Sequence, residues 1–321
     1  MNPTPDNKKV ETARNLVQLI VKEFKMNYPD LDVNSLDKTI ESPSSLQKVD
    51  LTGKELNKIG FHPIVLSTIC GTVFGDSSLS ITKGYVSARL QNRHSTRQTE
   101  WFLWKTLCIF QEFTEITSIQ FQLPDGHQEK APVKGFELLG KLKVTTHANE
   151  KLTKLHNIVV TGGKKTIKRK WLNHMNNYFL MSLWLDNGGL IGTLGDQGVI
   201  STGDMPFEEA KVLADYLKIV WHIDCTAVQF PKSPKQKMQN GHTRINIATQ
   251  ESLMRLLTII APIIPVKSML YKVCFYPESV SLQQRWASQD LKKLVRPEWH
   301  DELDKIYSYK KLKFLVNNKK A

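Results

Sequence analysis

The chain has 321 residues, of which 40% are hydrophobic, so it can bury a sizeable core in one large domain or in two packed halves. Its 44 Lys and Arg outnumber its 31 Asp and Glu, which gives a formal net charge of +13. This excess favours a polyanionic partner, nucleic acid before a membrane, although a basic but otherwise ordinary enzyme has a similar composition. The four cysteines lie far apart without a CxxC pair, which disfavours zinc and disulfide frameworks and predicts buried, reduced thiols. No apolar run has the length of a membrane span, so we expect no membrane partner. No import signal is legible at the start of the sequence.

The first 58 residues are predicted to form an N-terminal extension. Helical spacing runs through residues 10–26. The apolar residues of one face of this helix are Leu16, Ile20, Val21 and Phe24. A polar stretch then leads to a core helix over residues 63–75, with a proline in its first turn. Gly71 and Gly75 share a face of that helix, which predicts the close approach of another backbone.

An alternation of apolar and polar residues follows, and it predicts a β-hairpin that turns at Lys83 and Gly84. Hydrogen-bonding side chains lie on one face of this hairpin, and the other face carries the apolar residues Leu79, Ile81, Val86, Ala88 and Leu90. On a basic protein such a ribbon is a candidate reader of the major groove, and a solvated face is the alternative. The candidate nucleic-acid-binding residues here are Ser78, Ser80, Thr82, Tyr85, Ser87, Arg89, Gln91, Arg93 and Arg97.

The remaining predicted elements repeat one order twice. The first half continues with a helix over 99–113, strands over 116–123 and 142–146, and a helix over 149–156. The second half has a helix ending near 186, strands over 190–194 and 199–202, a helix reaching 221, strands over 226–230 and 243–248, and a helix over 251–260. Two copies of helix–strand–strand–helix–strand–strand–helix indicate an internal duplication. The basic residues of the second half that join the nucleic-acid-binding candidates are Lys232, Lys235, Lys237 and Arg244.

Two acidic, glycine-containing motifs each close an apolar run. The first is ICGTVFGD at residues 69–76, and the second is LMSLWLDNGG at residues 180–189. An acidic group just past the end of a buried helix, present twice in one chain, predicts two carboxylates that meet at a pseudo-twofold axis. Such a pair suits a divalent cation and phosphodiester chemistry.

These motifs, in their order and spacing, resemble the LAGLIDADG homing endonucleases of the single-chain type with two motifs. The resemblance covers about residues 60–276 and includes the stretches 163–167, 202–217 and 261–272. It implies an α/β saddle of two αββαββα units whose antiparallel sheets lie over duplex DNA. It also implies that Asp76 and the end of the second motif bind a shared divalent cation, Mg²⁺, and that Lys165 and Lys272 lie near the scissile phosphates. Without the resemblance, both lysines have the alternative of solvated surface side chains.

The second motif departs from the family pattern. Aligned on Gly188 and Gly189, the metal-binding Asp falls on Asn187, and Asp186 takes the preceding position. Asn before two glycines is also a common helix stop. Three accounts remain open: Asp186 takes the ligand role after local adjustment, the protein cleaves poorly or only nicks, or it keeps nucleic-acid binding without chemistry, as maturase relatives do.

The sequence thus predicts four segments: the extension at 1–58, one LAGLIDADG half at 59–160, a second at 161–276, and a basic C-terminal extension at 277–321. The leading prediction is a DNA endonuclease that acts as a monomer, with catalytic candidates at Asp76, Lys165, Asp186, Asn187 and Lys272 and metal ligands at Asp76 and Asp186. The alternative is an impaired relative that binds structured intron or ribosomal RNA as a group I intron maturase or other organellar factor. The resemblance places either one in an organelle, the mitochondrion before the plastid.

Overall fold

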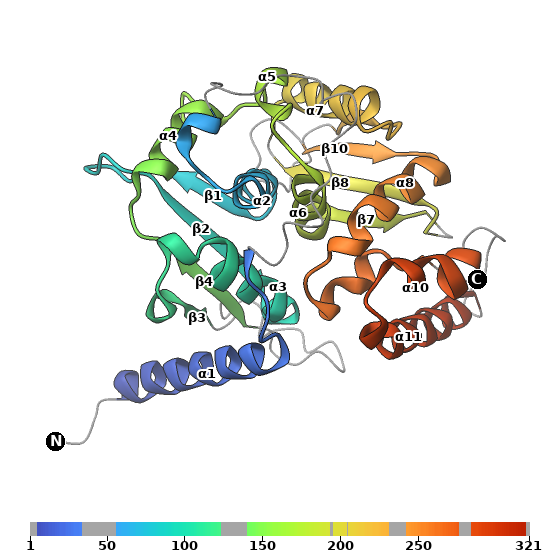
Figure 1. Ribbon diagram of the computed structural model, residues 1–321, viewed down its shortest axis with the longest axis horizontal. Helices are drawn as coiled ribbons and strands as arrows, with labels where there is room; N and C mark the ends of the chain where they lie inside the picture. Colours follow the sequence, from blue (N-terminus) through green and yellow to red (C-terminus); the bar gives the residue numbers. More distant parts are fainter. Residues whose placement is uncertain are drawn as a thin grey trace. The chain divides into compact units, whose positions relative to one another are not determined.

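The computed structural model describes residues 5–33, 56–122, 140–192, 195–203, 205–230, 242–275 and 284–318. The chain divides into two compact units, residues 1–38 with 76–157 and residues 39–75 with 158–321. Each unit contains one four-stranded antiparallel sheet together with helices (Figure 1). In the described ranges, every helix is too short or too polar to cross a membrane.

The first unit is built on a sheet with the strand order β1-β2-β4-β3. Its strands are β1 (Ser77–Ser80), β2 (Arg89–Ser95), β3 (Gln120–Gln122) and β4 (Lys141–Thr145). Its helices are α1 (Pro5–Asn27), α3 (Thr99–Trp104) and α4 (Glu150–Val159), with a π-helix η4 (Lys105–Ile109) that continues α3. Short 3₁₀ turns lie at η3 (Thr96–Gln98), η5 (Gln111–Phe113) and η6 (Ile116–Ser118). Leu90, Leu142 and Val144 are fully buried on one face of the sheet, and α3 packs against β2.

The helix α1 packs within the first unit, against α3 and β3. Val17, Val21 and Phe24 are buried, whereas Leu16 is 39% exposed, so the predicted apolar face was wrong at Leu16. The buried face of the helix is turned relative to the predicted one, because it carries residues 17, 21 and 24, whose spacing is also helical. Beyond the helix, the Tyr28 hydroxyl donates to Glu100 Oε2 at 2.9 Å.

The predicted hairpin is confirmed in β1 and β2, but its second strand begins later than expected. Residues 81–88 form the connection, in which Gly84 has a φ of +85°. Val86 is 87% exposed, so its assignment to the buried face was wrong, whereas Ala88 and Leu90 are buried as predicted. The register pairs Ser80 with Arg89, so pairing ends there. Of the nucleic-acid candidates, Thr82, Tyr85 and Ser87 therefore lie in a loop.

The second unit repeats the sheet of the first, with the strand order β7-β8-β10-β9. Its strands are β7 (Gly188–Ile191), β8 (Gln197–Gly203), β9 (Thr226–Phe230) and β10 (His242–Ile247). Its main helices are α2 (Pro63–Val73), α5 (Arg169–Leu172), α6 (Asn177–Asn187), α7 (Phe207–Val220) and α8 (Gln250–Ile260), with a small ribbon β5 (Val160–Thr161) and β6 (Lys164–Lys165). Further turns are η2 (Asn57–Ile59), η7 (Ala261–Ile263) and η8 (Lys267–Lys272). The equivalent strand orders confirm the predicted α/β class with two repeats.

The chain after residue 276 adds helices to the second unit. They are η9 (Trp286–Asp290), α10 (Leu291–Leu294), η10 (Pro297–Trp299) and α11 (His300–Asn318). Trp286 Nε1 donates to Val273 O at 2.9 Å, and Lys310 Nζ donates to Cys274 O. These contacts attach the C-terminal helices to the backbone of the two residues that follow η8. The four cysteines are buried, reduced thiols, as predicted.

Candidate catalytic centre and nucleic-acid interface

The helices α2 and α6 pack closely, and Gly71 makes this possible. A Cβ atom at Gly71 would lie 2.6 Å from Phe179 O and 2.8 Å from Ser182 Cβ. All of α6 from Asn177 to Asp186 is buried, as expected of a helix that is apolar on every side. At the start of the two helices, Asn176 N donates to Ser67 Oγ at 3.2 Å. The prediction that the glycine face admits another backbone is confirmed.

Asp186 lies against the C-terminal end of α2. A Cβ atom at Gly75 would lie 2.6 Å from Asp186 Cβ and 2.9 Å from its Oδ2. The Thr72 hydroxyl donates to that same Oδ2, and Asp186 is only 7% exposed. Gly75, which packs on Asp186, directly precedes Asp76, the acidic residue of the first motif.

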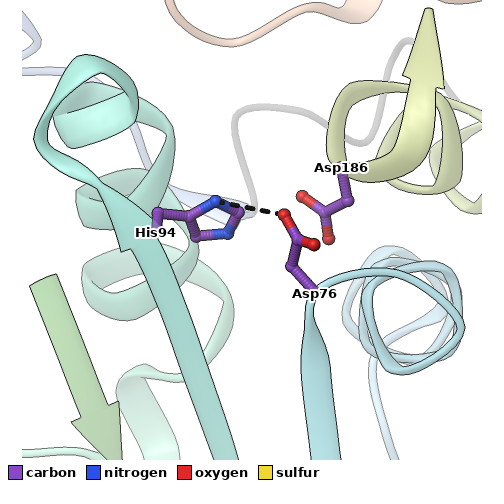
Figure 2. Close-up of side chains that lie close together, drawn as sticks. All are labelled: Asp76, His94 and Asp186. Carbon is purple, nitrogen blue, oxygen red and sulfur yellow. Dashed lines mark ion pairs between the residues drawn. The ribbon is translucent and has the colours of Figure 1, made fainter. Parts of the chain in front are cut away.

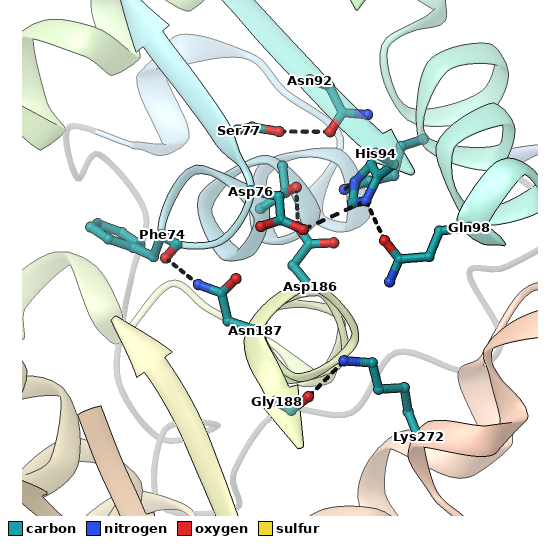
Figure 3. Close-up of polar contacts among 12 residues, drawn as sticks. Phe74, Asp76, Ser77, Asn92, His94, Gln98, Asp186, Asn187, Gly188 and Lys272 are labelled. Atoms are coloured by element: carbon teal, nitrogen blue, oxygen red, sulfur yellow. Dashed lines mark hydrogen bonds and ion pairs between the residues drawn. The ribbon is translucent and has the colours of Figure 1, made fainter. Parts of the chain in front are cut away.

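Asn187 joins the ends of the two motif helices and the second sheet. Its Nδ2 donates to Phe74 O at 3.2 Å (Figure 3) and to Ser201 O at 2.7 Å. Both neighbours are carbonyl oxygens, so an amide nitrogen suits this place and a carboxylate oxygen does not. The helix α6 ends here, with Gly188 in an extended conformation.

A lysine amine lies on the carbonyl end of each motif helix. Lys165, on β6, donates from Nζ to Val73 O, the last residue of α2. Lys272, at the end of η8, donates from Nζ to Gly188 O at 2.6 Å, one residue past α6 (Figure 3). A cation at a helix C-terminus is favoured by the exposed carbonyls and the helix dipole. Trp184 Nε1 holds the Lys272 backbone by donating to its carbonyl at 3.0 Å.

Asp76 belongs to the first unit, where it faces a histidine that the sequence analysis did not select. Its Oδ2 lies 3.5 Å from Nδ1 of His94 (Figure 2). The His94 side chain is fully buried, and that of Asp76 is 39% exposed. Asn92, two residues earlier on β2, accepts from Ser77 Oγ at 3.0 Å through Oδ1. The available signal was the alternation itself, because Asn92 and His94 occupy positions where the buried face of a strand is usually apolar.

One face of the first sheet is polar and solvent-accessible. Cross-strand pairing aligns Ser78 with Gln91 and Thr145, and Arg93 with Lys143 and Gln120. The polar residues of this face are Ser78, Ser80, Arg89, Gln91, Arg93, Gln120, Gln122, Lys141, Lys143 and Thr145. The sequence analysis missed the members of β3 and β4, although the alternation in residues 141–145 carries the same signal. Arg97 lies in η3, outside the sheet.

The corresponding face of the second sheet has fewer charges among the described residues. Arg244 on β10 pairs with Ser201 and Val228, and Asn246 pairs with Val199 and Thr226. The Arg244 guanidinium lies 4.3 Å from the centroid of the Phe230 ring. Its Nε and Asn246 Oδ1 have no hydrogen-bond partner within the part of the chain that the structure describes. Lys232, Lys235 and Lys237 lie outside the described residues.

The comparisons with known proteins agree with this fold. The sequence profile of the LAGLIDADG DNA endonuclease family matches residues 66–253, and the chain belongs to this family. Among solved structures, the homing endonuclease I-WcaI bound to its DNA recognition sequence is 19% identical, with a TM-score of 0.55 over 72% of this chain and 97% of that chain. The structure of I-DmoI in complex with DNA and Ca is 12% identical, with a TM-score of 0.34 over 63% of this chain and 92% of that chain. No curated protein matches the sequence significantly.

Proposed function

We propose that the protein is a sequence-specific endonuclease that hydrolyses phosphodiester bonds of duplex DNA. The observation that carries the proposal is the shared construction of the two motif-helix ends, each of which combines an acidic residue with a lysine amine. The Lys165 amine contacts Val73 O at the end of α2, in the motif that Asp76 closes, and the Lys272 amine contacts Gly188 O, just past the end of α6 that carries Asp186. Acidic oxygens and fixed cations together suit the binding of a cation and the stabilisation of charge on a phosphate.

The metal ligands in this proposal are Asp76 and Asp186. Their carboxylate oxygens are the hard donors that Mg²⁺ prefers. When bound, the cation supplies charge neutralisation at the scissile phosphate. That the two carboxylates share one cation is part of this proposal, and membership of the LAGLIDADG DNA endonuclease family supports it. Lys165 and Lys272 contribute positive charge where negative charge develops on the phosphate oxygens, and helix carbonyls orient both amines.

The polar faces of the two sheets are the proposed DNA-binding surfaces. In the first sheet, Arg89, Arg93, Lys141 and Lys143 provide cations for phosphates and base edges, and Gln91 provides an amide suited to adenine. In the second sheet, Val228 pairs with Arg244 and Val199 pairs with Asn246, so apolar contact with thymine methyl groups contributes more there. Both motif helices belong to one chain, which supports action as a monomer.

A second candidate function rests on Asn187. Its side chain brings no charge, and its amide nitrogen already binds two backbone carbonyls. A cation site built with Asn187 in place of a carboxylate is weaker. This favours an impaired relative that binds structured RNA without cutting, in the manner of a group I intron maturase.

Cleavage of a supercoiled plasmid library with Mg²⁺ tests the two candidates, with Asp76→Asn as the inactive control. We expect cutting that disappears in the control, because the control removes a carboxylate ligand of the cation. Absence of any cutting by the unmodified protein, together with tight binding to a structured RNA, would refute the endonuclease and support the RNA-binding candidate.

A further inference from the structure

The segment that leads from β5 into α6 is strongly basic. Residues 158–185 contain five Lys and Arg, at positions 164, 165, 168, 169 and 170, and no Asp or Glu. Short stretches this rich in Lys and Arg are typical of nucleic-acid contacts, and a solvated surface is the alternative. The structure of the segment favours the first of these interpretations.

Buried residues on both sides hold the last three cations of the segment in place. Before them, Ile167 is buried and its backbone N–H donates to Glu209 on α7. After them, Trp171 is buried as part of α5. The side chains of residues 168–170, between these two anchors, are exposed. A fixed stretch of backbone therefore presents three adjacent cations to solvent.

Arg169 is held in place through its own side chain as well. Its guanidinium lies 4.7 Å from the centroid of the Tyr216 ring, and its Nη1 donates to Asn173 Oδ1. Stacking on an aromatic ring leaves the edge of a guanidinium available for a phosphate. An arginine that is already oriented also loses less conformational freedom when it binds. This geometry is that of a binding group rather than of a freely moving surface side chain.

The acidic residues at the start of α7 are engaged elsewhere. Glu208 Oε2 lies 3.3 Å from Lys211 Nζ, and Glu209 accepts from the backbone N–H of residue 167. Among the residues that the structure describes, Lys168 and Arg169 have no carboxylate partner. Their positive charge is thus not neutralised locally, which favours a polyanion as the partner.

The cations of residues 168–170 lie on the helical layer of the second unit, near one motif-helix end. The helix α5 packs against α7, which packs in turn against β9 and β10 (Figure 1). The Lys165 amine contacts Val73 O at the end of α2. Lys170 is five residues further along the chain, so its Cα lies within about 18 Å of that of Lys165. This distance equals the axial length of about five base pairs.

We propose that residues 168–170 form a second DNA-contacting surface, which binds the phosphate backbone of duplex DNA in a sequence-independent way. The surface lies outside the strands that face bases in the proposed function, and it follows the chain onward from Lys165. Cations on phosphates fix the position of a protein on DNA and release counterions, so they raise the affinity for every duplex alike. The inference rests on the proposed function only in taking duplex DNA as the polyanion.

The experiment compares salt dependence in full-length protein and leaves the packing of Arg169 intact. Binding to a fluorescent duplex of random sequence is measured in EDTA over a series of KCl concentrations, for the unmodified protein and for the double variant Lys168→Gln/Lys170→Gln. If both lysines contact phosphates, the slope of log K against log salt falls by about 1.8, and binding at about 0.1 M salt weakens by about 60-fold. A fall of less than about 0.9, the value of one phosphate contact, would overturn the proposal.

Two control variants separate a local contact from other effects. Lys168→Arg/Lys170→Arg keeps both charges and should keep the slope of the unmodified protein. Lys22→Gln/Lys25→Gln removes two exposed lysines from α1 and should change the slope by less than one phosphate contact. Equal losses in either control and in the double variant would show an effect of packing or of net charge, and would overturn the proposal.

The outcomes also separate this inference from the proposed function. If the unmodified protein binds duplex DNA and never cuts it, the endonuclease proposal fails, and the slopes still decide whether residues 168–170 contact phosphates. If it cuts DNA and the slope is unchanged in the double variant, only this inference fails. A loss of affinity for a structured RNA, with duplex binding unchanged, would assign the surface to RNA and overturn the proposal.

Discussion

Replacement of Asn187 by Asp tests whether this residue acts as a structural link or as the missing second carboxylate. The substitution preserves side-chain shape and restores the residue that the family pattern leads one to expect. The Nδ2 atom of Asn187 donates at 2.7 Å and 3.2 Å to two backbone carbonyls. A carboxylate cannot donate and would direct its oxygens at these same carbonyls.

The expected loss of stability follows from the two hydrogen bonds. Each contributes about 1 kcal/mol net, so Asn187→Ala should lower the free energy of unfolding by about 2 kcal/mol. Asn187→Asp loses the same bonds and leaves a charged group beside two carbonyls, so we expect a total of about 3 kcal/mol. Partial exposure of the site keeps the charge term small. Asn187→Ala should therefore be the more stable of the two variants, although alanine resembles asparagine less in shape than aspartate does.

Urea unfolding followed by tryptophan fluorescence measures this order, with and without Mg²⁺. The plasmid assay on the same variants measures whether linear product increases. If Asn187→Asp is at least as stable as the unmodified protein and yields more linear product with Mg²⁺, Asn187 occupies a ligand position, and our account of it as a link between helix ends is wrong.

Three further changes have defined outcomes. Gly71→Ala should cost about 1–3 kcal/mol in urea unfolding because the added Cβ would lie 2.6 Å from Phe179 O, whereas Gly189→Ala, with no heavy atom within 4 Å, should cost little. Arg93→Ala should lower DNA affinity and reduce the slope of log K against log salt by about 0.9 if Arg93 contacts a phosphate. Burial raises the pKa of the Cys70 thiol from 9.0 to about 12. Above pH 9 the thiol therefore ionises in the unfolded state before it does in the folded state, and its contribution lowers the free energy of unfolding by about 1.4 kcal/mol per pH unit up to the folded pKa. Cys70→Ala should remove this contribution in reducing buffer.

Each of these predictions has a result that contradicts it. A stable Gly71→Ala would mean that α2 and α6 can separate without cost. An unchanged salt slope in Arg93→Ala would place DNA elsewhere, with Lys218→Ala on α7 as the control for lost charge alone. Parallel stability profiles for Cys70→Ala and the unmodified protein above pH 9 would show that the thiol ionises equally in both states.

Several elements were predictable because their signals are local. The helices α2, α7 and α8 begin at capping or proline positions, and residues 243–247 of β10 alternate between buried and partly exposed. The second hairpin strand was placed too early because residues 85–88 also alternate. Where pairing stops depends on the partner strand, and the register ends at Ser80 with Arg89. Nothing in residues 85–88 alone signals that boundary.

The sequence by itself determined the family, the repeated element order and the acidic and basic residues at the motif ends, because these follow from periodicity, glycine placement and motif spacing along the chain. Only the tertiary structure decided what Asn187, His94 and Lys105 contact. Asn187 reaches carbonyls that are distant in sequence, at Phe74 and Ser201. Lys105 meets His94 because the helix after β2 folds back against that strand. Hydrogen bonds between such groups depend on where separate elements pack, so no local pattern could have identified them. Burial makes these bonds important, because an unpaired buried donor or acceptor costs free energy.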